Sequence, residues 1–281
     1  MISSVKQVLL IDLEKGTYES KSFPDLHKFI GGVGVGIKLL DLYLENDPLI
    51  FAVGPLNGYF PYASKTSIVF LDNKNVEDIY IGGALSLRIQ FAGYDAVVLL
   101  NRAKASVSLA INKDSVAFHN SQNSLNSAVL PGRSSQLGIV GRKLLLDGYF
   151  EPKEDLLYKK FHSKNLANIM FTGTKKYTVK DMTKYKAIYF RLLSRTKDMR
   201  VEKGINPSCS GCPMGCSQSK RGELGGNVLV HSLVACSFAE EIYSDIGTIF
   251  SCLNILGYSY THEDIENLPY YIDQVLEGFN E

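Results

Sequence analysis

The sequence predicts an α+β fold in which a β-rich N-terminal part is followed by a short helical segment. Two observations carry this prediction. Runs of strand length, bounded by turn residues, recur as far as Thr172, whereas longer runs with helical spacing follow Thr178. The change of pattern falls near Lys176. We therefore expect an N-terminal α+β domain over residues 1–176 and a helical part over residues 177–281.

The first part should open with a β-hairpin, because alternating runs at 5–13 and 17–21 flank the turn residues Glu14-Lys15-Gly16. Further strands are predicted at residues 49–53, 66–71, 96–100, 106–111, 116–119 and 168–172. Helices are predicted over residues 24–40, 82–90 and 136–149. The glycines at 32, 34 and 36 do not fit G-x-G-x-x-G, so residues 31–36 predict a close-packed bend rather than a dinucleotide site.

The second part reads as helices around one loop. Helical patterns cover residues 181–202, 228–256 (as one or two helices) and 263–279, and the loop spans residues 203–216.

Composition narrows the class of protein. The chain has 281 residues, of which 45% are hydrophobic and 21% charged, as in a globular protein with a sizeable core. A net charge of +1 gives no case for nucleic acid or an anionic membrane. No apolar run approaches the ~20 residues of a membrane-spanning helix. Five cysteines, three of them clustered, fit a reducing compartment, so we expect a cytoplasmic protein.

The most informative motif is the trio Cys209, Cys212 and Cys216, spaced C-x2-C-x3-C. Thiolates are soft ligands, and three in one short loop suit an iron–sulfur cluster or a zinc ion. Gly211 allows tight turns beside a metal. In the zinc alternative, His231 would complete a Cys3His site.

A fourth ligand within this chain would be Cys236 or Cys252. Both lie in apolar helical stretches, where a free cysteine packs like a small hydrophobic residue. We favour Cys236. Otherwise the fourth position would go to a partner's residue, to an exogenous ligand or to none.

Five segments together resemble the N-terminal part of the aldehyde ferredoxin oxidoreductase family, in the family's order and at near-family spacing. They are residues 31–36, 54–58 (Gly-Pro-Leu-Asn-Gly), 91–98 (beginning Phe-Ala-Gly-Tyr-Asp), 163–166 and 209–216. The resemblance implies a β-rich base domain and a [4Fe-4S] cluster with Cys209, Cys212 and Cys216 as three of its ligands. Family members oxidise aldehydes at tungsten held by two pterins and pass the electrons to ferredoxin.

Several pterin elements of the family are changed in this chain. Thr66, with Lys65 beside it, occurs where the family has an arginine, and Tyr80-Ile81-Gly82-Gly83 replaces Asn-Ser-Gly-Gly. Residues 153–162 contain no glycine where the family has a glycine-rich loop, and the second pterin motif would lie beyond Glu281. The resemblance therefore implies the cluster more strongly than a tungsten or molybdenum pterin. By family position, the candidate cofactor-binding residues are Lys65, Gly82, Gly83, Asn254 and Gly257.

We therefore expect an iron–sulfur protein of this family that transfers electrons in, or as part of, an oxidoreductase acting on aldehydes. Its partner would be a second subunit or a ferredoxin-like electron carrier, and a homodimer fits as well. The alternative is a degenerate, non-catalytic relative with a structural metal site that binds a partner protein. No catalytic residue can be assigned from the sequence.

Overall fold

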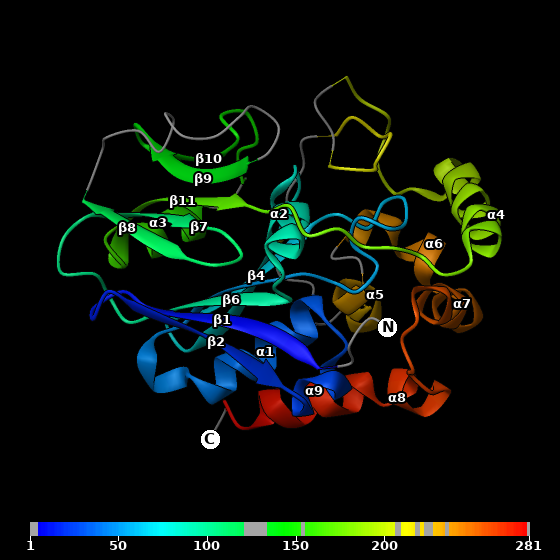
Figure 1. Cartoon of the computed structure of the whole chain (residues 1–281), viewed down its shortest axis with the longest axis horizontal. Helices are drawn as coiled ribbons and strands as arrows, with labels where there is room; N and C mark the ends of the chain where they lie inside the picture. Colours follow the sequence, from blue (N-terminus) through cyan, green and yellow to red (C-terminus); the bar gives the residue numbers. More distant parts are fainter. Residues whose placement is uncertain are drawn as a thin grey trace.

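The computed structural model describes residues 5–120, 134–152, 155–205, 209–216, 220–221, 227–233 and 236–279. It has an α+β fold, as the sequence predicts: two β-sheets lie one above the other, and helices gather beside and beneath them (Figure 1). The predicted division near residue 176 stays a prediction. Strand β12 and helices α5 and α9, from the second part, join elements of the first part.

Within the described residues the first sheet has seven strands in the order β12-β5-β4-β3-β6-β1-β2. Their bounds are β1 (Lys6–Asp12), β2 (Thr17–Phe23), β3 (Leu49–Ala52), β4 (Thr66–Asp72), β5 (Asn75–Ile81), β6 (Ala96–Leu100) and β12 (Lys220–Arg221). The predicted hairpin is confirmed as β1 and β2, which pair antiparallel. Strand β1 also pairs parallel with β6, and the other neighbours are antiparallel.

The described part of the second sheet has five strands in the order β10-β9-β11-β7-β8. They are β7 (Val107–Ile111), β8 (Val116–Asn120), β9 (Ser134–Val140), β10 (Lys143–Leu146) and β11 (Leu166–Thr172). Strands β7 and β11 pair in parallel, and the other pairs are antiparallel.

Helices cover the outer face of the first sheet, and two others pack against the second sheet within the core that the two sheets share (Figure 1). The α-helices are α1 (Gly32–Leu42), α2 (Leu85–Ala92), α3 (Asp155–Ser163), α4 (Met182–Leu193), α5 (Val228–Leu233), α6 (Glu240–Tyr243), α7 (Ile246–Leu256), α8 (His262–Glu266) and α9 (Leu268–Glu277). Short 3-10 turns are η1 (Asp25–Phe29), η2 (Leu44–Asn46), η4 (Ser194–Asp198) and η5 (Ser237–Ala239). The stretches predicted as long helices at 228–256 and 263–279 are thus broken into several shorter ones.

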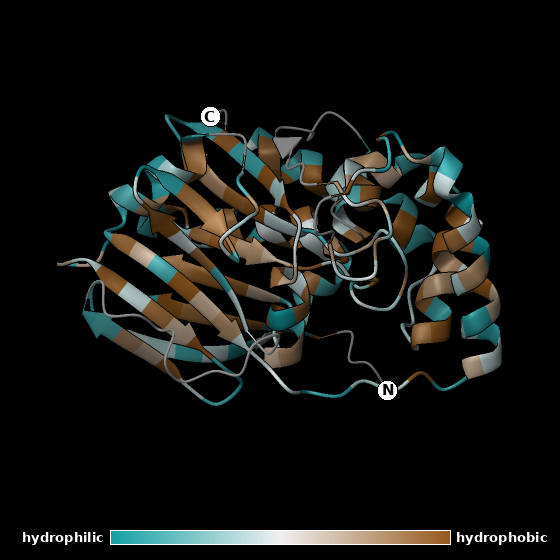
Figure 2. Ribbon diagram, turned by 90° about the horizontal axis from the view of Figure 1, so that it is seen from above, coloured by the Kyte–Doolittle hydropathy of each residue, from teal (hydrophilic) through white to brown (hydrophobic). Residues whose placement is uncertain are grey.

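Two hydrophobic cores lie on the two faces of the first sheet. In β1, Val8 and Leu10 face the core shared with α1, α5 and α9, whereas Leu9 and Ile11 face the core shared with the second sheet. Successive side chains of a strand point to opposite faces, so a strand buried on both faces is mostly apolar. Figure 2 shows these apolar positions along the strands of both sheets.

The helix predicted over residues 136–149 is wrong, because the structure has the antiparallel pair β9 and β10 there. The left-handed conformation of Gly141 (φ +65°) turns the chain between the two strands. Leu137 faces Ile169 of β11 in register, and both are fully buried. The pairing with a strand distant in sequence overrides the local helical pattern.

The close-packed bend predicted at residues 31–36 is confirmed. A β-carbon on Gly32 would lie 2.5 Å from the carbonyl oxygen of His231, and one on Gly54 would lie 1.9 Å from that of Leu233. The backbone amide of Gly34 donates to the Ser232 hydroxyl over 3.2 Å. Helix α5 therefore sits backbone to backbone against the start of α1, a position that only glycines permit.

The segment 163–166, one of those that carry the family resemblance, fastens α3 to two loops. Lys164 is fully buried, and its ammonium donates to the Asn101 carbonyl over 2.8 Å and to Asp47 Oδ2 over 3.2 Å. Burial lowers the pKa of Lys164 to about 8, against the opposing charge of Asp47. In this structure the segment has a structural role.

Candidate metal centre

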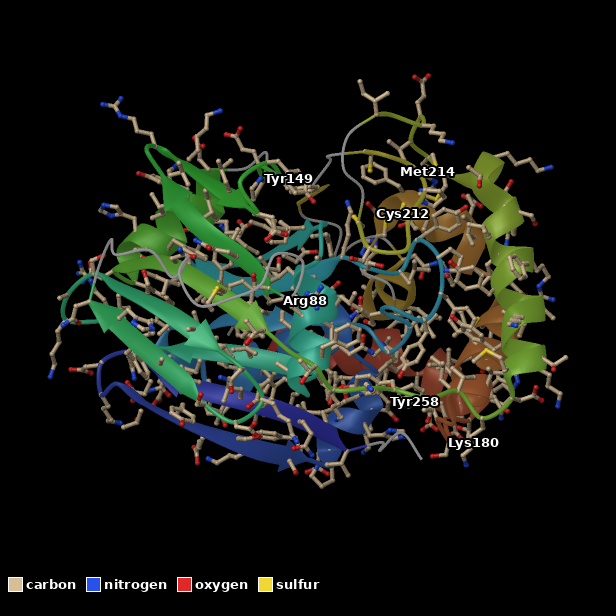
Figure 3. The ribbon with its side chains drawn as sticks, turned by 45° about the horizontal axis from the view of Figure 1, so that its top comes forward. Arg88, Tyr149, Lys180, Cys212, Met214 and Tyr258 are labelled. Atoms are coloured by element: carbon tan, nitrogen blue, oxygen red, sulfur yellow. The ribbon has the colours of Figure 1, made fainter. Side chains whose placement is uncertain are left out.

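The cysteine loop is a tight turn held against the first sheet. The Cys212 amide donates to the Cys209 carbonyl over 3.0 Å, and the Ser210 amide donates to the Gly83 carbonyl over 3.1 Å. Gly211 and Gly215 have φ of +75° and +62°, the left-handed region that glycine enters at little cost. The glycines of the motif therefore make the turns that the sequence predicts. Figure 3 shows Cys212 on this loop.

Four cysteines gather in this region. Cys209, Cys216 and Cys236 are buried, at 7%, 8% and 7% exposure, and Cys212 is partly exposed. Burial raises the pKa of the Cys209 thiol to about 12; Cys236 and Cys212 raise it further, and Lys65 opposes them. Burial likewise raises the pKa of Cys236, with Lys65 opposing and Cys216 adding to the rise. Each of the four thus interacts electrostatically with another, and we call them the cysteine set.

Cys252 lies elsewhere. It is fully buried on α7 and belongs to the core shared with α1. Burial raises its pKa to about 12, and Arg191 of α4 opposes the shift. Of the two candidates for a fourth ligand, the structure therefore brings only Cys236 to the cysteine loop.

The cysteines do not converge on one point. Among the residues that the structure describes, no three His, Cys, Asp or Glu side chains form a group that could hold a single metal ion. Zinc needs such convergence, since it binds four ligands tetrahedrally with sulfurs ~2.3 Å from one ion. The ligands of an iron–sulfur cluster are carried by different irons, so their sulfurs remain further apart.

Three of the residues predicted from family position border the cysteine set. Lys65 is 2% exposed, and its ammonium lies 4.8 Å from the centre of the Phe238 ring. A β-carbon on Gly82 would lie 2.4 Å from the Cys209 sulfur, so glycine is needed for the loop to approach β5. Gly83 has φ +71°, and its carbonyl accepts from the loop. One buried cation and two glycines thus surround Cys209.

Asn254 and Gly257 are placed differently. Gly257 ends α7 in the left-handed conformation (φ +88°), and its amide donates to the Asn254 carbonyl over 2.9 Å. This is a usual helix C-terminus. In the described part of the chain, neither Asn254 nor Gly257 borders the cysteine set.

His231, the histidine of the zinc alternative, is engaged with other side chains. It is fully buried on α5, with Nδ1 3.3 Å from the Tyr80 hydroxyl and Nε2 3.5 Å from Glu240 Oε1. Sequence reasoning missed this buried polar group, because strand β5, which carries Tyr80, was not predicted. The β-branched and aromatic residues Ile79, Tyr80 and Ile81, which favour a strand, were the signal that could have revealed it.

The positions expected to face a pterin phosphate are filled by protein. The β-carbon position of Gly82 is occupied by Cys209 and by the Phe150 ring, 3.1 Å away. Residues 155–163, part of the stretch in place of the family's glycine-rich loop, form α3, whose Phe161 is fully buried. Residues 153 and 154 lie outside the described part of the chain. The described residues at these positions do not fit a pterin.

Comparison with known proteins gives three findings. Residues 8–131 match the family model of the aldehyde ferredoxin oxidoreductase N-terminal domain. The chain is 35% identical over 104 residues to the aliphatic sulfonate oxidoreductase WOR-like subunit of Pyrococcus furiosus; the match covers 32% of this chain and 16% of that protein. It is similar in fold to the active site complex BamBC of benzoyl coenzyme A reductase in complex with 1,5-dienoyl-CoA.

The last similarity has a TM-score of 0.58 at 20% identity, over 72% of this chain and 37% of that one. At this identity it shows the fold alone. The chain thus matches a sixth of the length of the curated relative and just over a third of the solved structure. Among the described residues no helix is long and apolar enough to cross a membrane.

Proposed function

This chain is a divergent relative of the aldehyde ferredoxin oxidoreductase family, and on that premise we propose that it is an iron–sulfur component of an oxidoreductase, which transfers electrons for a reaction on an aldehyde. The single observation that carries the proposal is the cysteine set. Three of its thiols come from one loop, and Cys236 joins them from a segment 20 residues further along the chain.

The donor set fits a [4Fe-4S] cluster. Cys209, Cys212, Cys216 and Cys236 would supply four sulfur ligands, the number that such a cluster takes. When bound, the cluster would accept and release single electrons. A cluster binds cysteines as thiolates, so the thiols must lose their protons. The raised pKa values of Cys209 and Cys236 apply to the protein without metal. The positive charge of bound iron would lower both pKa values.

Lys65 would balance the negative charge of the thiolates. Its ammonium is buried beside Cys209 and Cys236 and opposes the rise in the pKa of both thiols. A cation this close stabilises the more negative, reduced state of a redox centre and so raises its reduction potential.

A protein partner follows from the same premise. The curated relative is named as a subunit, and the structural neighbour is a complex. Substrate chemistry on a pterin does not fit the described residues of this chain, so we propose that a second subunit supplies it. A ferredoxin-like carrier would then receive the electrons. We expect the protein to act in the cytoplasm, where thiols stay reduced.

The proposal is tested by anaerobic reductive titration of the protein after reconstitution with iron and sulfide. We expect uptake of about one electron per chain and an electron paramagnetic resonance signal of the reduced cluster. Lys65→Gln should shift the potential to a more negative value, whereas Lys186→Gln on the exposed face of α4 should leave it unchanged. A bound metal that takes up no electron would support the alternative, a non-catalytic relative with a structural metal site.

A further inference from the structure

A cavity of about 730 Å³ lies beside the second half of α2, away from the cysteine set. Its lining includes Arg88 and Phe91 of α2 and the segment 173–179, which links β11 to α4. Tyr59 and Tyr185 also line it. A volume of this size suits a small organic molecule. Figure 3 shows Arg88 near the centre of the molecule.

Hydrogen bonds hold the segment 173–179 against α2 and so fix the lining of the cavity. The Lys175 amide donates to the Phe91 carbonyl over 2.9 Å, and the Tyr177 hydroxyl donates to the Gln90 carbonyl over 2.7 Å. A β-carbon on Gly173 would lie 2.2 Å from the amide nitrogen of Ala92, so the segment is pressed against α2. The cavity is therefore built into the fold before any ligand arrives.

Aromatic rings form its apolar surface. The Tyr59 and Tyr177 rings meet edge to face with their centres 6.1 Å apart, and Phe91 stacks on Tyr177 at 6.4 Å. The Tyr185 hydroxyl donates to the Tyr59 carbonyl, which holds the fourth ring in place. Such surfaces favour a planar or otherwise apolar ligand body.

The charges at the cavity have one sign. Its described lining contains Arg88, Lys175 and Lys176 and no acidic residue. The Lys175 ammonium lies 5.1 Å from the centre of the Tyr177 ring, and the Arg88 guanidinium lies 5.8 Å from that of Phe91. Burial lowers the pKa of Arg88, and Asp147, which does not line the cavity, opposes this shift. The lysines are exposed, so their charge remains available to an anion.

The hydroxyl of Tyr59 is a buried hydrogen-bond donor at the cavity. Its side chain is 7% exposed, and its hydroxyl has no hydrogen-bond partner among the residues that the structure describes. Tyr59 and Tyr177 also line a neighbouring cavity, whose lining includes Asp95. A buried hydroxyl without a partner is unfavourable, and an acceptor brought by a ligand would satisfy it.

We propose that this cavity binds a small organic anion, a carboxylate or sulfonate with an aromatic or other apolar body. The apolar part would lie against Tyr59, Phe91 and Tyr177, and the anionic group would face Lys175 and Arg88 and accept from the Tyr59 hydroxyl. The proposal does not depend on the cysteine set, because no residue of that set lines the cavity.

The test is calorimetric titration of the whole chain with benzoate, benzenesulfonate, benzamide and acetate. We expect the two aromatic anions to bind at least about tenfold more tightly than neutral benzamide or acetate, which lacks the apolar body. Tyr59→Phe should weaken benzoate binding about tenfold without lowering thermal stability, since it removes a hydroxyl that has no partner. Lys175→Gln should weaken binding similarly, and Lys186→Gln, outside the cavity, should not.

Equal binding of benzamide and benzoate would overturn the proposal, as would the absence of binding by all four compounds. Equal losses in Lys175→Gln and Lys186→Gln would show that only net charge matters and would overturn it too. A preference between benzoate and benzenesulfonate would identify the anionic group. Because the titration needs no bound metal, it can succeed or fail independently of the iron–sulfur proposal.

Discussion

Replacing Cys209 with serine is expected to remove most of the iron that the protein holds after anaerobic reconstitution. Cys209 is buried, and its thiol interacts with both Cys212 and Cys236, so its loss should affect the rest of the cysteine set. A serine hydroxyl is a hard and weakly acidic group that replaces thiolate poorly on iron. The measurement is iron and sulfide per chain, compared with the unaltered protein treated in the same way.

Cys252→Ser is the matched control. Cys252 is also buried, but on α7 beside Arg191, so its loss should cost packing and leave the iron content unchanged. Cys236→Ser then decides the fourth ligand: it should behave like Cys209→Ser. Equal iron retention in the Cys209 and Cys252 variants would contradict the assignment of the site.

Gly54→Ala should destabilise the fold strongly. The added β-carbon would lie 1.9 Å from the Leu233 carbonyl oxygen and 2.4 Å from its carbon, and the backbone of α5 cannot yield as a flexible side chain can. Gly31 and Gly32, at the start of α1, also lie close to the backbone of this helix, at Ser232 and His231. We expect the free energy of unfolding to fall by about 3 kcal/mol, the upper part of the usual range for overpacking.

Gly247→Ala is the control for this prediction. Gly247 lies in the first turn of α7, where the nearest atom to an added β-carbon is Asp245 Oδ2 at 3.5 Å, an ordinary contact. Alanine favours a helix over glycine by about 1 kcal/mol, so stability should stay the same or rise slightly. Denaturant unfolding of both variants provides the measurement. Equal stability of the two would show that α5 does not pack on Gly54 as the structure has it.

Much of the first sheet could be predicted, because its strands carry local signals. The hairpin of β1 and β2 has alternating residues and a glycine turn, and β3, β4 and β6 are apolar runs of strand length. Apart from Thr66, Ser67 and Asp72 of β4, these runs are apolar because both faces of the sheet are buried. Residues 8–131, which match the family's N-terminal domain, contain β2, β3, β4, β6 and most of β1.

In the second sheet β7, β8 and β11 were predicted as strands, whereas β9 and β10 were predicted as a helix, because the pairing of β9 with β11 is not local. Leu137 and Leu144 suggest a helix when read alone, yet they lie in adjacent strands that depend on β11. Gly138 packs against the Asn168 side chain, which would be 2.9 Å from an added β-carbon. A contact between residues 30 positions apart leaves no signal in a local window.

The candidate metal centre was also predictable only in part, because some of its residues are close in sequence and others are not. The spacing of Cys209, Cys212 and Cys216 was visible in the sequence, because these residues share one loop. The approach of Cys236 and the burial of Lys65 beside them depend on how the second part of the chain packs on the first. The cavity at Tyr59 was not predicted, since its lining comes from three separate segments.

The most direct test of the central claim is the metal content of the chain after purification without oxygen, measured for iron, zinc, tungsten and molybdenum. We predict about four iron atoms per chain with matching sulfide, and tungsten, molybdenum and zinc far below one. One zinc ion per chain with no iron would contradict the claim and leave a structural metal site. Tungsten or molybdenum near one per chain would contradict the conclusion that the residues beside Cys209 do not fit a pterin.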